Sequence, residues 1–186
     1  MPLVHFPHEL FSPAELSAAR LDGELTLVGE AYASTAGLET SEIRAASMRL
    51  ILGERLAAIG MSAAWVHGAV GLPPAVHHVQ RGRAGVARPV RHDVRFRDTP
   101  LADEDTVVIG GVRVASPART LVELAREASD PEIATVAARL ATSGLIDDAL
   151  RWLRAHRRFP GRQPAMAYLA GLRSAARAPG QDEVTR

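Results

Sequence analysis

Helix start positions in this chain are marked by three dipeptides in which a proline follows a helix-capping residue. The dipeptides are Ser12-Pro13, Ser116-Pro117 and Asp130-Pro131. Serine and aspartate cap helix N-termini with their side-chain oxygens, and proline tolerates the first helical position because its missing N–H would be unsatisfied there anyway. Glu15 adds the spacing of a capping box to the first of these starts. The sequence therefore predicts helices over residues 12–20, 116–128 and 130–143.

Glycine dipeptides and turn residues predict two hairpins. Residues 25–28 and 31–33 flank Gly29-Glu30, and residues 106–109 and 112–115 flank Gly110-Gly111. Two more strand candidates lie between the hairpins, at residues 75–80 and 90–97, so we expect a small antiparallel sheet. Apolar periodicity predicts the remaining helices at residues 41–60, 62–68, 145–156 and 164–173.

These elements predict an α+β protein. Residues 1–40 are expected to form a truncated, degenerate winged-helix-like unit with a linker, because a helix followed by a hairpin is the end of a winged helix, yet only about eleven residues precede Ser12. Residues 41–178 are expected to form a larger domain of short antiparallel sheet flanked by helices. Residues 179–186 look like a disordered tail.

Composition excludes several classes of chemistry. The 186 residues are 47% hydrophobic, enough to bury a core, and contain no cysteine, which excludes disulfides, thiolate zinc sites and cysteine nucleophiles. All 22 basic residues are arginine, so chemistry that needs a lysine is excluded. With no charged leader and no apolar run of about 18 residues, we expect a cytoplasmic protein.

No motif in the chain predicts an enzyme, a cofactor or a metal site. The glycine pair Gly110-Gly111 lacks the lysine of a phosphate-binding loop. His77 and His78 are adjacent in a predicted strand, so they point to opposite faces and cannot bind one metal together. The acidic residues 103–105 have no lysine to complete a nuclease site and are interpreted as a solvated loop.

Arginine clustering is the main electrostatic feature. Arg91, Arg95 and Arg97 share one face of a regular strand and would form a charged stripe, which binds phosphates or an acidic protein surface. The alternative is an ordinary solvated face. The candidate partner-binding or phosphate-binding residues are Arg81, Arg83, Arg88, Arg91, Arg95, Arg97, Arg154, Arg157 and Arg158.

Other notable residues are interpreted as structural. Arg119 lies in the first turn after Ser116-Pro117, where the helix dipole disfavours a cation, and Glu123 four residues later can pair with it. Trp65 and His67 lie at a helix end closed by a glycine, where a histidine more often packs and caps than catalyses.

Three segments resemble the AbiEi-type antitoxins of type IV toxin–antitoxin systems and the related bacterial transcriptional regulators. They are residues 11–24 around Ser12-Pro13, the Trp-Val-His-Gly string at 65–68, and Ser-Pro-Ala-Arg-Thr-Leu-Val-Glu-Leu-Ala at 116–125. The likeness extends from about residue 11 to 172. It implies a non-enzymatic protein whose N-terminal winged helix binds the operator of its own operon. The C-terminal domain is implied to contribute to operator binding and antitoxicity, and the partner is a nucleotidyltransferase toxin.

Two functional hypotheses follow. The first is an antitoxin that antagonises a nucleotidyltransferase toxin and also autoregulates its operon, with the arginines as the contact surface. The alternative is a stand-alone DNA-binding transcriptional regulator that uses the same arginines on phosphates. The N-terminal unit departs from the family pattern, since its helix offers only Arg20 and its wing carries Glu30. We therefore expect weak DNA binding there, and the hairpin is alternatively a packing or dimerisation element.

Overall fold

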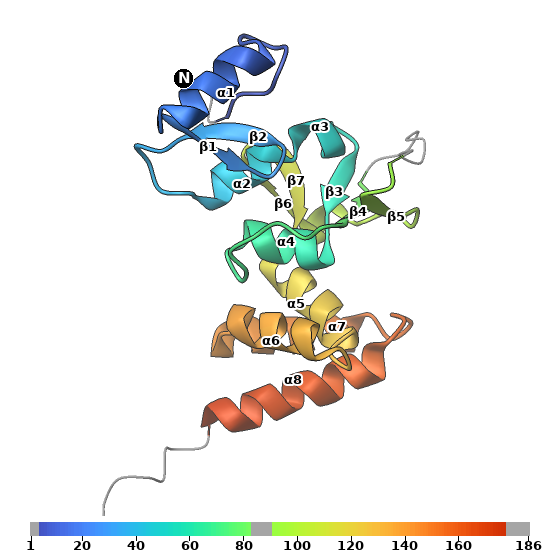
Figure 1. The fold of residues 1–186 in the computed structure, drawn as a ribbon. Helices are drawn as coiled ribbons and strands as arrows, with labels where there is room; N and C mark the ends of the chain where they lie inside the picture. Colours follow the sequence, from blue (N-terminus) through green and yellow to red (C-terminus); the bar gives the residue numbers. More distant parts are fainter. Residues whose placement is uncertain (1–3, 83–90, 178–186) are drawn as a thin grey trace, which may run out of the picture. The chain divides into compact units, whose positions relative to one another are not determined.

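The structure is a computed structural model, and it describes residues 4–82 and 91–177. Contacts divide the chain into two compact units, Met1–Ser116 and Pro117–Arg186 (Figure 1). The first unit contains all the described strands together with short helices, and the described part of the second is helical. The predicted α+β class is confirmed. Residue 40, where the sequence suggested a boundary, lies inside the first unit.

The N-terminal helix and hairpin form as predicted. Helix α1 (Pro13–Leu21) begins with a complete capping box, in which Ser12 Oγ accepts from Glu15 N and Glu15 Oε2 accepts from Ser12 N at 2.7 Å. Strands β1 (Leu25–Val28) and β2 (Ala31–Ser34) then pair antiparallel around Gly29-Glu30.

The central sheet is mixed, so the prediction of an antiparallel sheet is wrong. Its strand order is β5-β4-β3-β7-β6, with parallel pairing of β3 with β7 and of β4 with β5. The connection from β4 to β5 is long enough for a parallel crossover, whereas a two-residue hairpin permits only antiparallel pairing. The strands are β3 (Leu56–Ala58), β4 (His77–Arg81), β5 (Val94–Arg97), β6 (Thr106–Ile109) and β7 (Val112–Ala115).

The prediction of a single helix over residues 41–60 is also wrong. The segment forms α2 (Ser41–Ser47), α3 (Arg49–Leu52) and then the central strand β3. Gly53 has a φ of +49°, a left-handed conformation that ends the helix. All three residues of β3 are buried, and such a short apolar run has no alternation to distinguish it from a helix.

The core of the first unit lies between the sheet and helices α2, α3 and α4 (Gly60–Val66). Residues 62–66 are all buried, and Trp65 has the largest fully buried side chain among the described residues. A short 3-10 turn, η1 (Asp103–Asp105), leads into β6, so the predicted acidic loop is present, but Asp105 is 7% exposed and therefore not solvated.

The second unit has four described helices close to the predicted positions: α5 (Pro117–Arg126), α6 (Pro131–Leu140), α7 (Ser143–Ala155) and α8 (Arg162–Arg177). Helix α5 packs against each of the other three. Asp130 caps α6 by accepting from Glu132 N at 2.8 Å. Leu121, Leu124, Leu153 and Leu169 form the buried interior.

Candidate partner-binding surfaces

The predicted arginine stripe is shorter in the structure than in the sequence analysis. Arg95 and Arg97 alternate along β5 with Val94 and Phe96, which pack against the core. Arg91 precedes the strand, so it does not extend the stripe as predicted. Arg83 and Arg88 lie outside the described residues.

Arg91 instead links the N-terminal hairpin to the segment before β5. Its guanidinium pairs with the carboxylates of Glu30 and Asp93, the latter at 2.6 Å. Hydrogen bonding from Arg91 lowers the pKa of Asp93 to about 2, and the two carboxylates raise the pKa of Arg91. Arg91 is therefore committed to an internal contact between segments 61 residues apart in sequence.

The tip of the N-terminal hairpin is packed against the body of the first unit. Gly29 has a φ of +57°, and a Cβ built there would lie 2.7 Å from Ser47 Oγ and 3.2 Å from the Trp65 ring. Val28 and Ala31 on either side of the turn are buried. A turn held in this way does not project like a DNA-binding wing, which favours the packing interpretation of the hairpin.

The remaining cations of this sheet differ in how far they are compensated. Arg97 Nη1 donates to Gln80 Oε1 at 3.3 Å, and Arg81 Nε lies 3.3 Å from Asp98 Oδ1. Arg95 is exposed, and no ion pair to it forms within the described residues. Of the candidates on β4 and β5, Arg95 is thus the one best placed to meet an external anion.

The Trp65–His67 segment packs into the first unit, with Trp65 fully buried and the His67 ring hydrogen-bonded to the backbone. His67 Nε2 donates to the carbonyl of Ala115 at 2.8 Å, and burial lowers the pKa of His67. Burial likewise lowers the pKa of His77, whose Nδ1 lies 3.3 Å from Ser62 Oγ. Ser62 is fully buried and accepts a hydrogen bond from His78 N at 2.9 Å. The side chains of Ser62 and His77 are therefore part of the packed core of the first unit.

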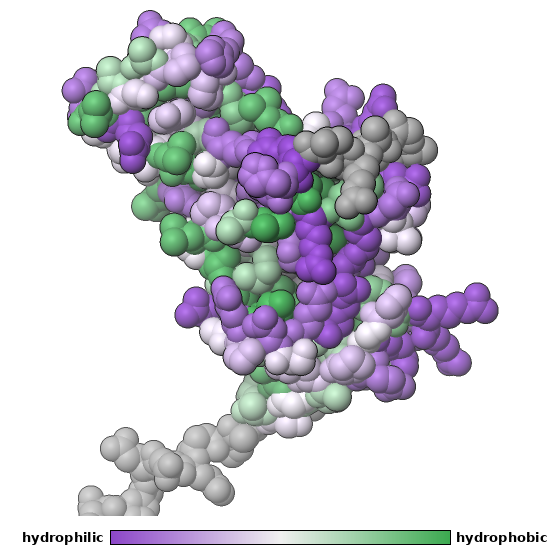
Figure 2. Space-filling model, turned by 45° about the vertical axis from the view of Figure 1, so that its right-hand side comes forward, coloured by the Kyte–Doolittle hydropathy of each residue, from purple (hydrophilic) through white to green (hydrophobic). Residues whose placement is uncertain are grey.

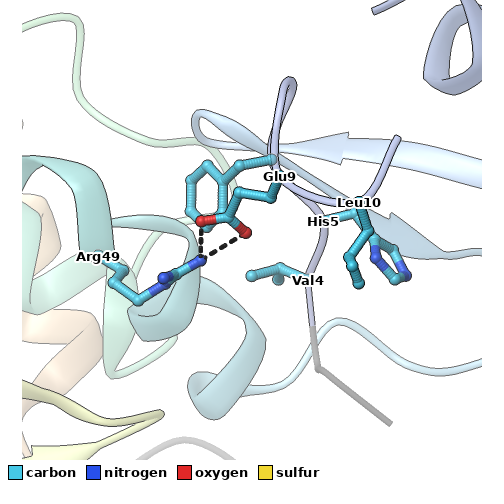
Figure 3. Close-up of a pocket in the computed structure, with 6 residues that line it drawn as sticks. Val4, His5, Glu9, Leu10 and Arg49 are labelled. Carbon is cyan, nitrogen blue, oxygen red and sulfur yellow. Dashed lines mark hydrogen bonds and ion pairs between the residues drawn. The ribbon is translucent and has the colours of Figure 1, made fainter. Parts of the chain in front are cut away.

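A second arginine anchors the N-terminal segment and was not identified from the sequence. Arg49 of α3 donates to both carboxylate oxygens of Glu9 at 2.7 and 2.8 Å (Figure 3). The guanidinium of Arg49 also lies 4.8 Å from the centre of the Phe6 ring. The two residues are 40 positions apart, and no local pattern signals such a pair. The neighbouring cavity of about 60 Å³ has room for a few waters, not for a substrate.

A larger cleft of about 330 Å³ lies between α1 and β1. Apolar side chains such as Phe11 and Leu25 line it, with the carboxylates of Glu15 and Glu24. The carboxylate of Glu15 accepts hydrogen bonds from Ser12, the N-cap of its own helix, and these bonds lower the pKa of Glu15. Hydrophobic residues reach the surface among hydrophilic ones over this N-terminal region, at the top of Figure 2.

Nowhere in residues 4–82 and 91–177 do three potential metal ligands cluster.

The predicted pair of Arg119 and Glu123 is confirmed and is part of a larger buried network. Both side chains are nearly inaccessible, at 5% and 2% exposure, and their charges are in contact. Arg126 Nε lies 3.2 Å from Glu123 Oε2. The guanidinium of Arg119 also lies over the rings of Trp152 and Phe159, at 4.8 and 4.9 Å. This network joins α5 to α7 and to the turn that follows α7.

Three exposed arginines lie close together in the sequence at the end of α7 and in the turn after it, and are here called the α7-end cluster: Arg154, Arg157 and Arg158. Among the described residues, none of the three makes an ion pair. Their neighbours are different, since Arg151 pairs with Asp148 at 2.8 Å and Arg162 Nε donates to the carbonyl of Leu153 at 2.8 Å. The cluster therefore presents uncompensated positive charge.

Comparison with known families identifies the chain. The family model of the AbiEi antitoxin C-terminal domain matches residues 56–171, more than half of the sequence. The chain belongs to the AbiEi antitoxin family. A search of curated proteins finds no match.

The matched region of this AbiEi antitoxin begins at β3 and ends within α8. It contains the Trp65–His67 segment, the Arg119–Glu123 pair and all of the candidate arginines, whereas α1 and the β1–β2 hairpin lie outside it. None of the helices described is both long and apolar enough to span a bilayer.

Proposed function

We propose that this antitoxin is a non-catalytic cytoplasmic protein that antagonises a nucleotidyltransferase toxin. The family match over residues 56–171 carries the antitoxin role. The nucleotidyltransferase is the toxin type that the sequence resemblance implies. The chemistry of the described residues is consistent with a binding protein, because the buried polar residues of the Trp65–His67 segment and of the Arg119–Glu123 network are engaged in the fold.

The proposed contact surfaces are Arg95 and the α7-end cluster. These are candidate arginines that the protein exposes without an ion pair among its described residues. Arginine binds carboxylates and phosphates through a planar fork of donors, so an acidic patch of the toxin or its nucleotide-binding region fits this chemistry. Arg91 is excluded from the surface because Glu30 and Asp93 already neutralise it.

Co-expression with the product of the adjacent gene tests the proposal. We expect growth rescue by the wild-type chain, and loss of rescue when Arg154, Arg157 and Arg158 are all replaced by glutamate. Arg139→Glu is the matched control, since Arg139 is also an exposed arginine of the second unit. A cluster variant that rescues as well as Arg139→Glu would remove the cluster from the contact surface, and absence of rescue by wild type would refute the toxin assignment.

Autoregulation by operator binding is the second proposed function, and the same exposed arginines favour it. The N-terminal unit is unsuited to the task, because residues 4–34 carry one arginine, Arg20, against five carboxylates: Glu9, Glu15, Asp22, Glu24 and Glu30. Binding to the protein's own promoter should fall steeply with salt, with a log–log slope of about −0.9 for each phosphate contact. A slope that the cluster variant leaves unchanged would contradict this role.

A further inference from the structure

An aromatic stack stands beside the α7-end cluster. The rings of Trp152 and His156 are parallel within 11°, with their centres 3.9 Å apart. Trp152 is half-buried, and its position is fixed by the edge-on ring of Phe159 and by the Arg119 guanidinium. His156 is the C-cap residue of α7 and is exposed. The histidine ring therefore forms the outer layer of the stack.

The imidazole is held in place before any ligand arrives. His156 Nδ1 lies 2.9 Å from the carbonyl oxygen of Trp152, and because a carbonyl only accepts, Nδ1 carries the proton and donates it. This bond and the stacking contact fix the ring plane, so its rotational freedom is already lost. A planar ligand that stacks on the outer face would pay little further ordering entropy.

Three arginines flank His156 in the sequence. Arg154 precedes His156 by two residues, and Arg157 and Arg158 follow it directly; all three are exposed. A flat aromatic surface among uncompensated cations suits a ligand that combines a planar ring with phosphates. An unpaired nucleotide has both features, whereas the bases of a duplex already stack on each other and offer only their edges.

The geometry points to a binding site for single-stranded nucleic acid at the end of α7. An unpaired base stacks on His156 and extends the Trp152–His156 stack by one layer. The α7-end cluster holds the flanking phosphates. RNA and single-stranded DNA share this chemistry, so the site is defined by the unpaired base and the phosphate, and the two polymers are compared in the test.

Binding of the purified full-length chain to labelled oligouridylate, oligothymidylate and a duplex of the same length tests the site. Fluorescence anisotropy is measured over a range of salt concentrations. We expect at least one single strand to bind more tightly than the duplex. The polymer that binds more tightly identifies the preferred source, RNA or DNA. No toxin is present in this assay, so it succeeds or fails independently of the proposed antitoxin activity.

Two kinds of variant separate stacking from charge. His156→Ala should weaken single-strand binding about tenfold without changing the salt slope, because a stacked base contributes about 1–3 kcal/mol. His156→Tyr should restore affinity, since tyrosine also offers a flat ring. Arg157→Gln with Arg158→Gln should reduce the salt slope by about 0.7 for each lost phosphate contact.

Three results would overturn the inference. One is absence of binding to both single strands. Another is equal affinity of His156→Ala and wild type, which would leave only attraction of phosphates to arginine. The third is a duplex that binds as tightly as the single strands. Arg139→Glu is the control for overall charge, and circular dichroism verifies that each variant is folded.

Discussion

Replacing Glu123 with glutamine tests whether the buried charge network holds the second unit together. Glutamine keeps the shape of the side chain but removes the charge that contacts Arg119 and lies 3.2 Å from Arg126 Nε. Arg119 is 5% exposed, so its positive charge would remain buried without its carboxylate partner. Breaking a buried pair in this way lowers the free energy of unfolding by about 3–5 kcal/mol. The whole free energy of unfolding of a typical domain is only about 5–15 kcal/mol, so the loss is a large part of it.

Urea unfolding followed by circular dichroism and tryptophan fluorescence measures the loss, with Trp152 reporting on the second unit. Asp148→Asn is the matched control, because the Asp148–Arg151 pair is exposed and should contribute about 1 kcal/mol or less. Arg119→Met combined with Glu123→Leu should be less destabilised than Glu123→Gln, since it removes both charges. If Glu123→Gln is as stable as Asp148→Asn, the network is not desolvated and the reasoning is wrong.

Three further predictions concern the first unit. Gly29→Ala should lower the unfolding free energy by about 3 kcal/mol, because of the positive φ and a hydroxyl 2.7 Å from the new Cβ, whereas Gly23→Ala, with open space around it, should lose only about 1 kcal/mol in urea unfolding. Arg91→Glu should lower the melting temperature by adding a third carboxylate to the two it now bridges, while Arg95→Glu changes stability by about 0.5 kcal/mol or less; equal effects would refute the bridge. Burial lowers the pKa of His77, so below about pH 6.5 the unfolded chain binds a proton that the folded chain resists, and stability falls as pH falls; His77→Gln should flatten this dependence, and parallel pH curves would contradict it.

The sequence was sufficient wherever the determining interaction is local. Ser12 and Glu15, which are three residues apart, form the capping box of a helix. Gly110-Gly111 forms a tight turn with positive φ at both residues, and Arg119 pairs with Glu123 one helical turn later. Each of these depends on neighbours within four positions, which a linear pattern contains. The same local string, from Ser116 to Ala125, carried the family resemblance that the comparison then confirmed.

Tertiary structure alone decided which arginines are available to a partner. In the sequence Arg91 and Arg95 look alike, but Arg91 pairs with Glu30, 61 residues away, as well as with Asp93, whereas no ion pair to Arg95 forms within the described residues. The direction of strand pairing in the sheet was equally out of reach, because β3 pairs with β7 across more than fifty residues. Such contacts depend on which distant segments the core brings together, and one chain read in order contains the residue types but not their spatial neighbours.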